Sequence, residues 1–318
     1  MSGTEIQASP RRIPLPDAAR GLALLAMASY HFTWDLEFFG YLEPGTATQG
    51  LWKLYARGIA SSFLFLVGFS LVLAHVHGVR WSSFGKRLGM VAAAALAITA
   101  VTSFAFPGAA IYFGILHAIA VSSLIGLAFL RLPVIVTLAA AAGAIAAPLY
   151  LRLPAFDGFW LLWLGLAETP QRSNDYVPLL PWIAPVLIGI AAARLSIRSG
   201  FLETMAKWRR MPHLLMLAGR HSLLFYLVHQ PVLIALVYIA SLIYPAPKPD
   251  PVQSYLGSCQ ISCTQGANEA AFCTRFCGCT LDKLAEQDLL TPFLEGKINP
   301  NEDERIGAIA ESCSSTAE

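Results

Sequence analysis

Long apolar stretches alternate with short polar connections along most of this 318-residue chain. Windows of about 20 residues, the length that an α-helix needs to cross the hydrocarbon core of a bilayer, recur between Gly21 and Tyr244 with few charges inside them. We therefore expect an all-α polytopic membrane protein with about seven transmembrane helices. The expected spans are residues 18–39, 58–76, 88–106, 112–130, 133–151, 179–196 and 222–244.

One further apolar stretch is too short to be a span. The segment FWLLWLGLA at residues 159–167 has about half the required length and is rich in tryptophan, which favours the membrane interface. We interpret it as an interfacial or re-entrant piece. An eighth span at this position would place the C-terminus on the opposite side of the membrane.

Composition divides the chain into two parts. Overall, 56% of the residues are hydrophobic and 13% are charged, against about 25% charged in an ordinary soluble domain, which excludes a single water-soluble core. Residues 1–245 hold 17 Lys and Arg and 9 Asp and Glu, whereas residues 246–318 hold 5 and 11. The predicted organisation is a cytoplasmic N-terminus at 1–17, a transmembrane domain at 18–245, a linker at 246–253 and a helical tail at 254–318.

All six cysteines lie in the acidic tail, which indicates a small disulfide-stapled module in an oxidising compartment. Two pairs have a spacing of four residues, so each pair places both thiols on one helical face. Two short antiparallel helices joined by disulfides are the simplest arrangement, although six cysteines permit fifteen connectivities. Zinc is the rival ligand, but the usual two-residue spacing is absent and we expect no metal. The expected pairs are Cys259–Cys277, Cys263–Cys273 and Cys279–Cys313.

Basic residues in the loops predict the orientation, because Lys and Arg concentrate on the cytoplasmic side. With seven spans, eleven of them fall on the side of the N-terminus, and the C-terminus is then periplasmic, where disulfides form. We expect a multi-pass protein of the inner (plasma) membrane with its N-terminus in the cytoplasm. The eleven residues are Arg11, Arg12, Arg80, Lys86, Arg87, Arg131, Arg194, Arg198, Lys207, Arg209 and Arg210.

The first span carries an unusual stripe of polar residues. Arg20 and His31 are eleven residues apart, which is only about 20° from three full turns, so they share one helix face. Asp17 lies one turn before Arg20, and Asp35 lies one turn after His31. Each such group costs roughly 2.5–3.5 kcal/mol on insertion scales, which favours a functional role. The alternative is that Arg20 and Asp17 snorkel to the headgroups while His31 bonds a neighbouring span.

Four later residues are further candidates. His117 lies in the first turns of the fourth span, either lining an acceptor pocket or satisfied by a backbone carbonyl. His229 and Gln230 immediately precede Pro231, which frees backbone carbonyls and tends to kink a helix, so they are expected to shape a cavity. Arg220 lies at the cytoplasmic end of the seventh span, where it either snorkels or contacts a phosphate.

The sequence RIPLPDAARGLALLAMASYHFTWDL resembles the first span of the membrane-bound acyltransferase superfamily, whose Arg, ten residues, His signature is matched by Arg20 and His31. The closer resemblance is to bacterial relatives of the heparan-α-glucosaminide N-acetyltransferase catalytic domain, and it covers about residues 11–245. Three further stretches carry it in the same order: YFGILHAIAVSSL at 112–124, PLLPWIAPVLIGIAAAR at 178–194 and GRHSLLFYLVHQPVLI at 219–234.

This resemblance implies transfer of an acetyl group from acetyl-CoA to a hydroxyl or amine of an envelope glycan or saccharide across the membrane. Arg20, with Asp17 and Arg220 beside it, would hold the CoA phosphates at the cytoplasmic mouth. His31 would take the acceptor's proton or become transiently acylated, and Asp35 would orient its ring. In the animal enzymes the associated histidine lies in the loop after this span, whereas residues 32–74 here contain none.

Two other classes of function remain as alternatives. A proton-coupled transporter would use the intramembrane His and Asp residues as a relay, and a non-catalytic membrane scaffold would use the tail to recruit a periplasmic partner. Paired half-repeats, which many transporters show, are absent from the sequence. Membrane lipid and a saccharide are the expected partners, and no nucleic acid is expected.

Overall fold

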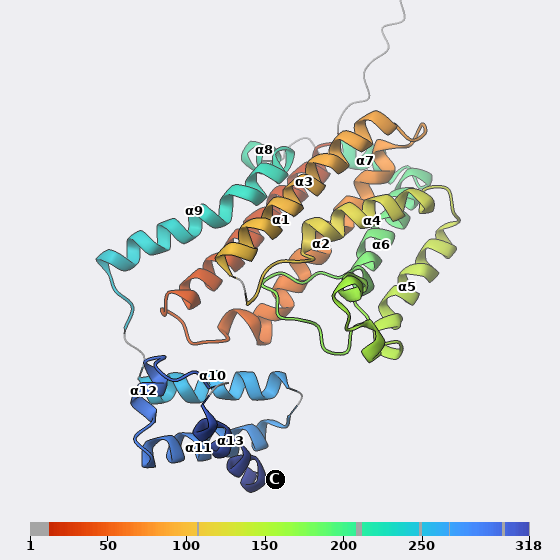
Figure 1. The fold of residues 1–318 in the computed structure, drawn as a ribbon. Helices are drawn as coiled ribbons and strands as arrows, with labels where there is room; N and C mark the ends of the chain where they lie inside the picture. Colours follow the sequence, from red (N-terminus) through yellow and green to blue (C-terminus); the bar gives the residue numbers. More distant parts are fainter. Residues whose placement is uncertain are drawn as a thin grey trace, which may run out of the picture. The chain divides into compact units, whose positions relative to one another are not determined.

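The computed structural model describes residues 13–106, 108–207, 212–247, 250–266, 268–300 and 303–317. Within these ranges the chain is helical, with one isolated β-bridge and no strand (Figure 1). The chain forms two compact units, residues 1–29 with 54–231 and residues 30–53 with 232–318. Four of the basic residues used to predict the orientation, Arg11, Arg12, Arg209 and Arg210, lie outside the described residues.

Each of the seven predicted spans coincides with a helix in the described part of the chain. Four of these helices, α2, α3, α6 and α9, are long and apolar enough to cross a bilayer. Helices α4 and α5 are apolar but have 15 and 17 residues, so α4 rises only about 22 Å against roughly 30 Å of hydrocarbon. The helices are α1 Pro14–Phe38, α2 Gly50–Ala74, α3 Trp81–Ala105, α4 Ile115–Phe129, α5 Val134–Tyr150, α6 Leu179–Arg198 and α9 Ser222–Ile243.

Two short helices between α6 and α9 do not appear in the hydropathy pattern. They are α7, Phe201–Lys207, and α8, His213–Arg220. Their lengths of seven and eight residues are well below a span, and the sequence of α8 mixes apolar and basic residues. A hydropathy scan with a window of about 20 residues therefore detects neither α7 nor α8.

Helix α6 lies at the centre of the first unit and packs against α4 and α5. It also meets α2 through glycines on both helices. A Cβ atom added to Gly68 would lie 1.9 Å from the carbonyl oxygen of Val186, and one added to Gly189 would lie 2.1 Å from that of Phe65. Small residues allow such close approach of backbones where no hydrophobic effect drives helices together.

The loops before α4 and before α6 are joined at one end of the first unit. Phe113 and Tyr176 form a parallel β-bridge, and the backbone N–H of Val177 donates to the carbonyl of Phe113 at 3.0 Å. The tryptophan-rich segment forms only the six-residue 3₁₀ helix η3, Phe159–Leu164. The prediction that this segment is not a span is therefore confirmed.

The tail forms a helical hairpin in the second unit. Helix α10, Pro251–Gln265, is joined to α11, Ala270–Glu286, by the disulfides Cys259–Cys277 and Cys263–Cys273. The third disulfide, Cys279–Cys313, ties α11 to α13, Glu304–Ala317. This is the expected pairing, in which two disulfides follow from the four-residue spacing and the third joins the two remaining cysteines.

A small apolar core supports the hairpin. It contains Leu284, Leu289 and Ile309 together with Cys313, which is completely buried. The short helix α12, Leu290–Leu294, covers part of it. A core of this size is marginal without covalent links, which explains why three disulfides occur in so short a segment.

Candidate functional site

An ion-paired cluster lies at the beginning of α1 in the first unit. Arg20 Nη1 lies 2.9 Å from Asp17 Oδ1, and Arg20 Nη2 donates a hydrogen bond to the hydroxyl of Ser70 on α2. The other carboxylate oxygen of Asp17 lies 3.7 Å from Nε of Arg220, which ends α8. Three residues that the sequence proposes for donor binding are thus brought together, although Arg220 follows Asp17 by 203 positions.

Glycine determines how closely α8 approaches α1. A Cβ atom on Gly219 would lie 1.8 Å from the carbonyl oxygen of Asp17, and one on Gly21 would lie 2.1 Å from that of Leu215. Any side chain at either position therefore forces the two helices apart. This backbone contact places Arg220 next to Asp17, since the two glycines are neighbours of Arg20 and Arg220 in sequence.

His31 and Asp35, the other two residues of the polar stripe on α1, belong to the second unit. His31 is half-buried and its ring lies edge-on to that of Tyr30, with centroids 5.6 Å apart. Asp35 is completely buried. Both lie in the uninterrupted helix α1, so the four-residue spacing places them on one face, one turn apart.

Glu37, which the sequence analysis did not single out, shapes the loop that follows α1. Its two carboxylate oxygens accept hydrogen bonds from the backbone N–H groups of Gly45 at 2.6 Å and Ala47 at 2.7 Å. Ala47 is completely buried. The carboxylate therefore fixes the chain reversal between α1 and α2 by satisfying two backbone donors that no helix satisfies.

His229 is held within α9 of the first unit. It is 9% exposed, and its Nδ1 donates to the carbonyl of Tyr226 at 2.7 Å. The ring stacks on Phe225 with centroids 6.1 Å apart. Pro231 follows within the same helix, as the sequence predicts for a perturbed turn. Nδ1 is thus the protonated nitrogen in the neutral ring, and Nε2 carries the lone pair.

His117 has hydrogen-bond contacts at both ring nitrogens. The backbone N–H of Gly114 donates to Nδ1 at 3.2 Å, and Nε2 lies 3.3 Å from the hydroxyl of Thr99 on α3. Because Nδ1 accepts, the neutral ring carries its proton on Nε2. These contacts tie the start of α4 to α3. His117 thus lies at the joined loops, and both of its ring nitrogens already have hydrogen-bond contacts within the protein.

Asp175, in the loop before α6, is a residue that the sequence analysis did not single out. Its Oδ2 accepts a hydrogen bond from the backbone N–H of Ile115 at 2.9 Å, at the N-terminus of α4. Burial raises the pKa of Asp175 to about 6, while the hydrogen bond from Ile115 acts in the opposite direction. A Cβ on Gly114 would lie 2.3 Å from this oxygen, so a side chain there would displace the carboxylate of Asp175. In the sequence, Asp175 could have been noticed as an acidic residue three positions before the stretch at 178–194 that carries the family resemblance.

Aromatic residues surround the joined loops. Tyr112 lies against Tyr176 with ring centroids 5.4 Å apart and against Phe159 at 6.1 Å. Its hydroxyl donates to the carbonyl of Gln171 at 3.0 Å. Burial raises the pKa of both tyrosines, so both remain neutral and able to donate hydrogen bonds at physiological pH.

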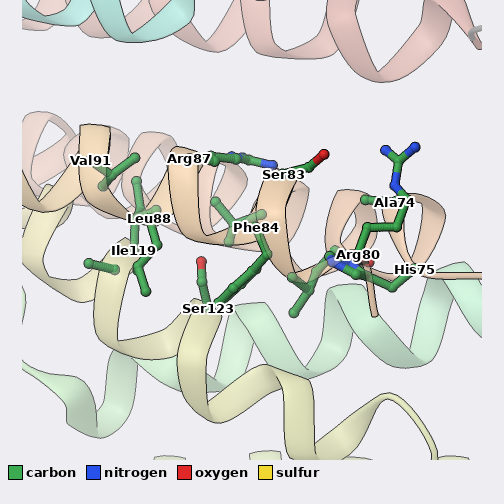
Figure 2. Close-up of a pocket in the computed structure, with 13 residues that line it drawn as sticks. Ala74, His75, Arg80, Ser83, Phe84, Arg87, Leu88, Val91, Ile119 and Ser123 are labelled. Atoms are coloured by element: carbon green, nitrogen blue, oxygen red, sulfur yellow. Dashed lines mark hydrogen bonds between the residues drawn. The ribbon is translucent and has the colours of Figure 1, made fainter. Parts of the chain in front are cut away.

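At the end of the first unit opposite the joined loops, two cavities are lined by basic residues. The smaller, of about 180 Å³, lies between α2, α3 and α4 and includes His75, Arg80 and Arg87 together with Ser83 and Ser123 (Figure 2). The larger, a groove of about 1110 Å³, shares His75 and is bounded by the ends of α2, α4 and α6. Neither cavity was predicted, because each requires helix ends that are distant in sequence to meet.

Within the described residues, no group of three or more His, Cys, Asp or Glu side chains is arranged to hold a metal ion. The fold and these clusters define a helical membrane protein with titratable and ion-paired residues inside and between its apolar helices. The model of one family, heparan-alpha-glucosaminide N-acetyltransferase, catalytic, matches residues 12–231, which is 220 of the 318 residues. The chain belongs to this family of membrane acyltransferases. No curated protein and no solved structure matches the chain.

Proposed function

We propose that this protein transfers an acetyl group from acetyl-CoA to a hydroxyl or amine of a cell-envelope glycan or saccharide. The observation that carries the proposal is α1, which lies in the family-matched region and presents Arg20, ion-paired to Asp17, and His31 eleven residues later. Membership of an acyltransferase family implies an acyl-CoA donor. The acetyl group and the saccharide acceptor are part of the proposal.

The reaction requires a base and a leaving group. The acceptor's oxygen or nitrogen attacks the thioester carbonyl, the C–S bond breaks, and CoA leaves as a thiol. In the direct route His31 takes the acceptor's proton and returns it to the sulfur. In the two-step route the His31 imidazole first forms a C–N bond to the acyl group, releasing the thiol, and the acceptor then displaces the imidazole. Asp35 stabilises the cationic ring in either route.

The cluster of Asp17, Arg20 and Arg220 is the proposed contact for the donor. Two guanidinium groups share one carboxylate, so the cluster carries a net charge of +1, and 46% of the Arg220 side chain is exposed. Arginine binds phosphate oxygens through charge-assisted hydrogen bonds. Asp17 holds the two arginines together and limits their repulsion before the donor binds.

The acceptor is proposed to bind among His117, His229 and Gln230. His229 is buried in α9 with its Nδ1 bonded to the carbonyl of Tyr226, and His117 fixes the joined loops at the start of α4. The proposed topology has the N-terminus in the cytoplasm and the tail in the periplasm, with the chain in the inner membrane. The tail is then available to a periplasmic partner or to stabilise the extracytoplasmic end.

Transfer of radiolabel from acetyl-CoA tests the proposal. The full-length protein in lipid nanodiscs is offered amino sugars and glycans, and His31→Ala and Arg20→Ala are compared with His213→Ala, an exposed histidine on α8. We expect His31→Ala to lower kcat by about 10²–10⁴-fold and Arg20→Ala chiefly to raise the KM for acetyl-CoA, with His213→Ala unchanged.

The two routes and the rival functions give different results in the same assay. A rapid denaturing quench at neutral pH without acceptor, which labels the wild type but not His31→Ala, shows that His31 becomes acylated. Transfer that is indifferent to both His31→Ala and Arg20→Ala refutes the assignment of α1. Proton flux without transfer to any acceptor supports a transporter instead, and the absence of both supports a scaffold.

A further inference from the structure

A basic groove lies where the ends of α2, α4 and α6 meet in the first unit. Its volume is about 1110 Å³, and its wall includes Arg131 from the turn after α4, Arg194 and Arg198 from the last turns of α6, and His75 and His77 after α2. This volume is slightly above the roughly 300–1,000 Å³ that is typical of small-molecule and cofactor sites. Five basic side chains therefore line one concave surface.

Among the residues that the structure describes, no acidic side chain lines this groove. In the described part of the chain, no carboxylate forms a salt bridge with Arg131, Arg194 or Arg198. The cluster at α1 is different, because Asp17 neutralises part of the charge of Arg20 and Arg220. The three guanidinium groups of the groove thus give a charge of at least +3 at neutral pH, with no ion-paired carboxylate among the described residues.

The groove is partly organised without a ligand. Arg194 is half-buried and donates a hydrogen bond to the carbonyl of Leu132, which holds its side chain across to the turn after α4. His75 donates from Nδ1 to the carbonyl of Leu71 at 2.7 Å and directs Nε2 away from the backbone. Groups that are already fixed lose less entropy when a ligand binds.

The smaller cavity extends this basic surface. It shares His75 with the groove and adds Arg80 and Arg87, with the hydroxyls of Ser83 and Ser123 nearby. Figure 2 shows Arg87 and Ser83 on α3 and Ser123 on the neighbouring helix α4. Guanidinium, imidazole and hydroxyl groups are donors that suit the oxygens of a phosphate ester.

We propose that this groove is a binding site for a phosphate-bearing ligand. Loop arginines that serve only to orient a membrane protein need no common cavity, whereas these converge on one and form no ion pair with a carboxylate of the described ranges. Two sources carry the chemistry: the phosphates of coenzyme A and the headgroup of an anionic phospholipid. The site is defined by binding and does not depend on acyl transfer.

Binding to the full-length protein in phosphatidylcholine nanodiscs tests the site. One arm measures equilibrium binding of tritiated coenzyme A, and the other measures phosphatidylglycerol retained by the protein in native mass spectrometry. Arg131→Gln/Arg198→Gln removes two exposed charges of the groove. Lys86→Gln/Arg152→Gln removes two exposed charges that line neither cavity and is the matched control. Size-exclusion profiles and Tm values confirm that each variant folds.

We expect the groove variant to bind one of the two probes at least about tenfold more weakly, and the control to match the wild type within about twofold. Raising the salt concentration should weaken the same binding, because exposed charges are screened. Loss in the coenzyme A arm identifies the donor as the ligand, and loss in the phosphatidylglycerol arm identifies a lipid. Equal binding by the groove variant and the wild type, or no saturable binding of either probe to the wild type, overturns the site. Acetyl transfer is measured separately, so its failure is distinguishable.

Discussion

The carboxylate of Asp175 accepts a hydrogen bond at 2.9 Å from the backbone N–H of Ile115, sixty residues earlier in the chain. It places a negative group at the N-terminus of α4, where the helix dipole and the unsatisfied N–H groups favour it. Burial opposes this by penalising the charged form. The loop before α6 and the start of α4 are thus joined by a group that titrates near neutral pH.

Asp175 should therefore make stability depend on pH. Its pKa of about 6 in the folded protein is above the ordinary value of 3.8, so its contribution is fully present below pH 3.8 and is lost as the pH rises through 6. We expect the apparent Tm in detergent to fall between pH 4 and 6.5 in the wild type, and to fall less in Asp175→Asn, whose amide oxygen still accepts from Ile115.

Asp157→Asn is the matched control for this measurement. The hydrogen bonds from Thr169 lower the pKa of Asp157, so its contribution is present above 3.8 and is lost only as the pH falls through the lower value. The control should have the same profile as the wild type between pH 4 and 6.5. Parallel profiles of the wild type and Asp175→Asn would contradict the assignment.

The contact between α2 and α6 should tolerate no side chain at Gly68. The Cβ of Gly68→Ala would lie 1.9 Å from the carbonyl oxygen of Val186, and backbone cannot yield as a flexible side chain does. We expect a loss of about 1–3 kcal/mol, seen as a Tm lower by several degrees in detergent. Gly58→Ala on the same helix meets no atom within 4 Å and should be neutral or stabilising by up to about 1 kcal/mol. Equal Tm values for the two variants would refute the close packing.

The tail cysteines report both pairing and topology. All six are in disulfides, so a membrane-impermeant maleimide should label none of them in cells whose outer barrier is permeabilised while the inner membrane stays intact. After an impermeant reductant, we expect labelling of the tail from the periplasmic side. Cells opened on both sides provide the maximum signal for comparison. Labelling only in those opened cells would place the tail in the cytoplasm and refute the proposed orientation.

Much of the fold was predictable from local patterns. Each predicted span matches a helix, because burying an unpaired backbone in lipid forces helical hydrogen bonding wherever the chain is apolar for long enough. The boundaries differ where polar residues continue a helix: α2 begins at Gly50 and not at residue 58, since Lys53 and Arg57 lower the hydropathy without breaking the helix. Two of the three disulfides were expected from a four-residue spacing, which fixes the helix face, and the third joins the two cysteines that remained.

The candidate site was predictable only in part. The alignment of Arg20 with His31 depends on one helix and its period, so the sequence determined it. The contact of Arg220 with Asp17, the capping of α4 by Asp175 and the basic groove each join segments that are distant in the chain. The hydropathy pattern predicts which segments form membrane helices, but it does not predict which faces of these helices pack against one another. Those pairings follow from close backbone contacts, such as that of Gly219 with Asp17, which only the packed tertiary structure decides.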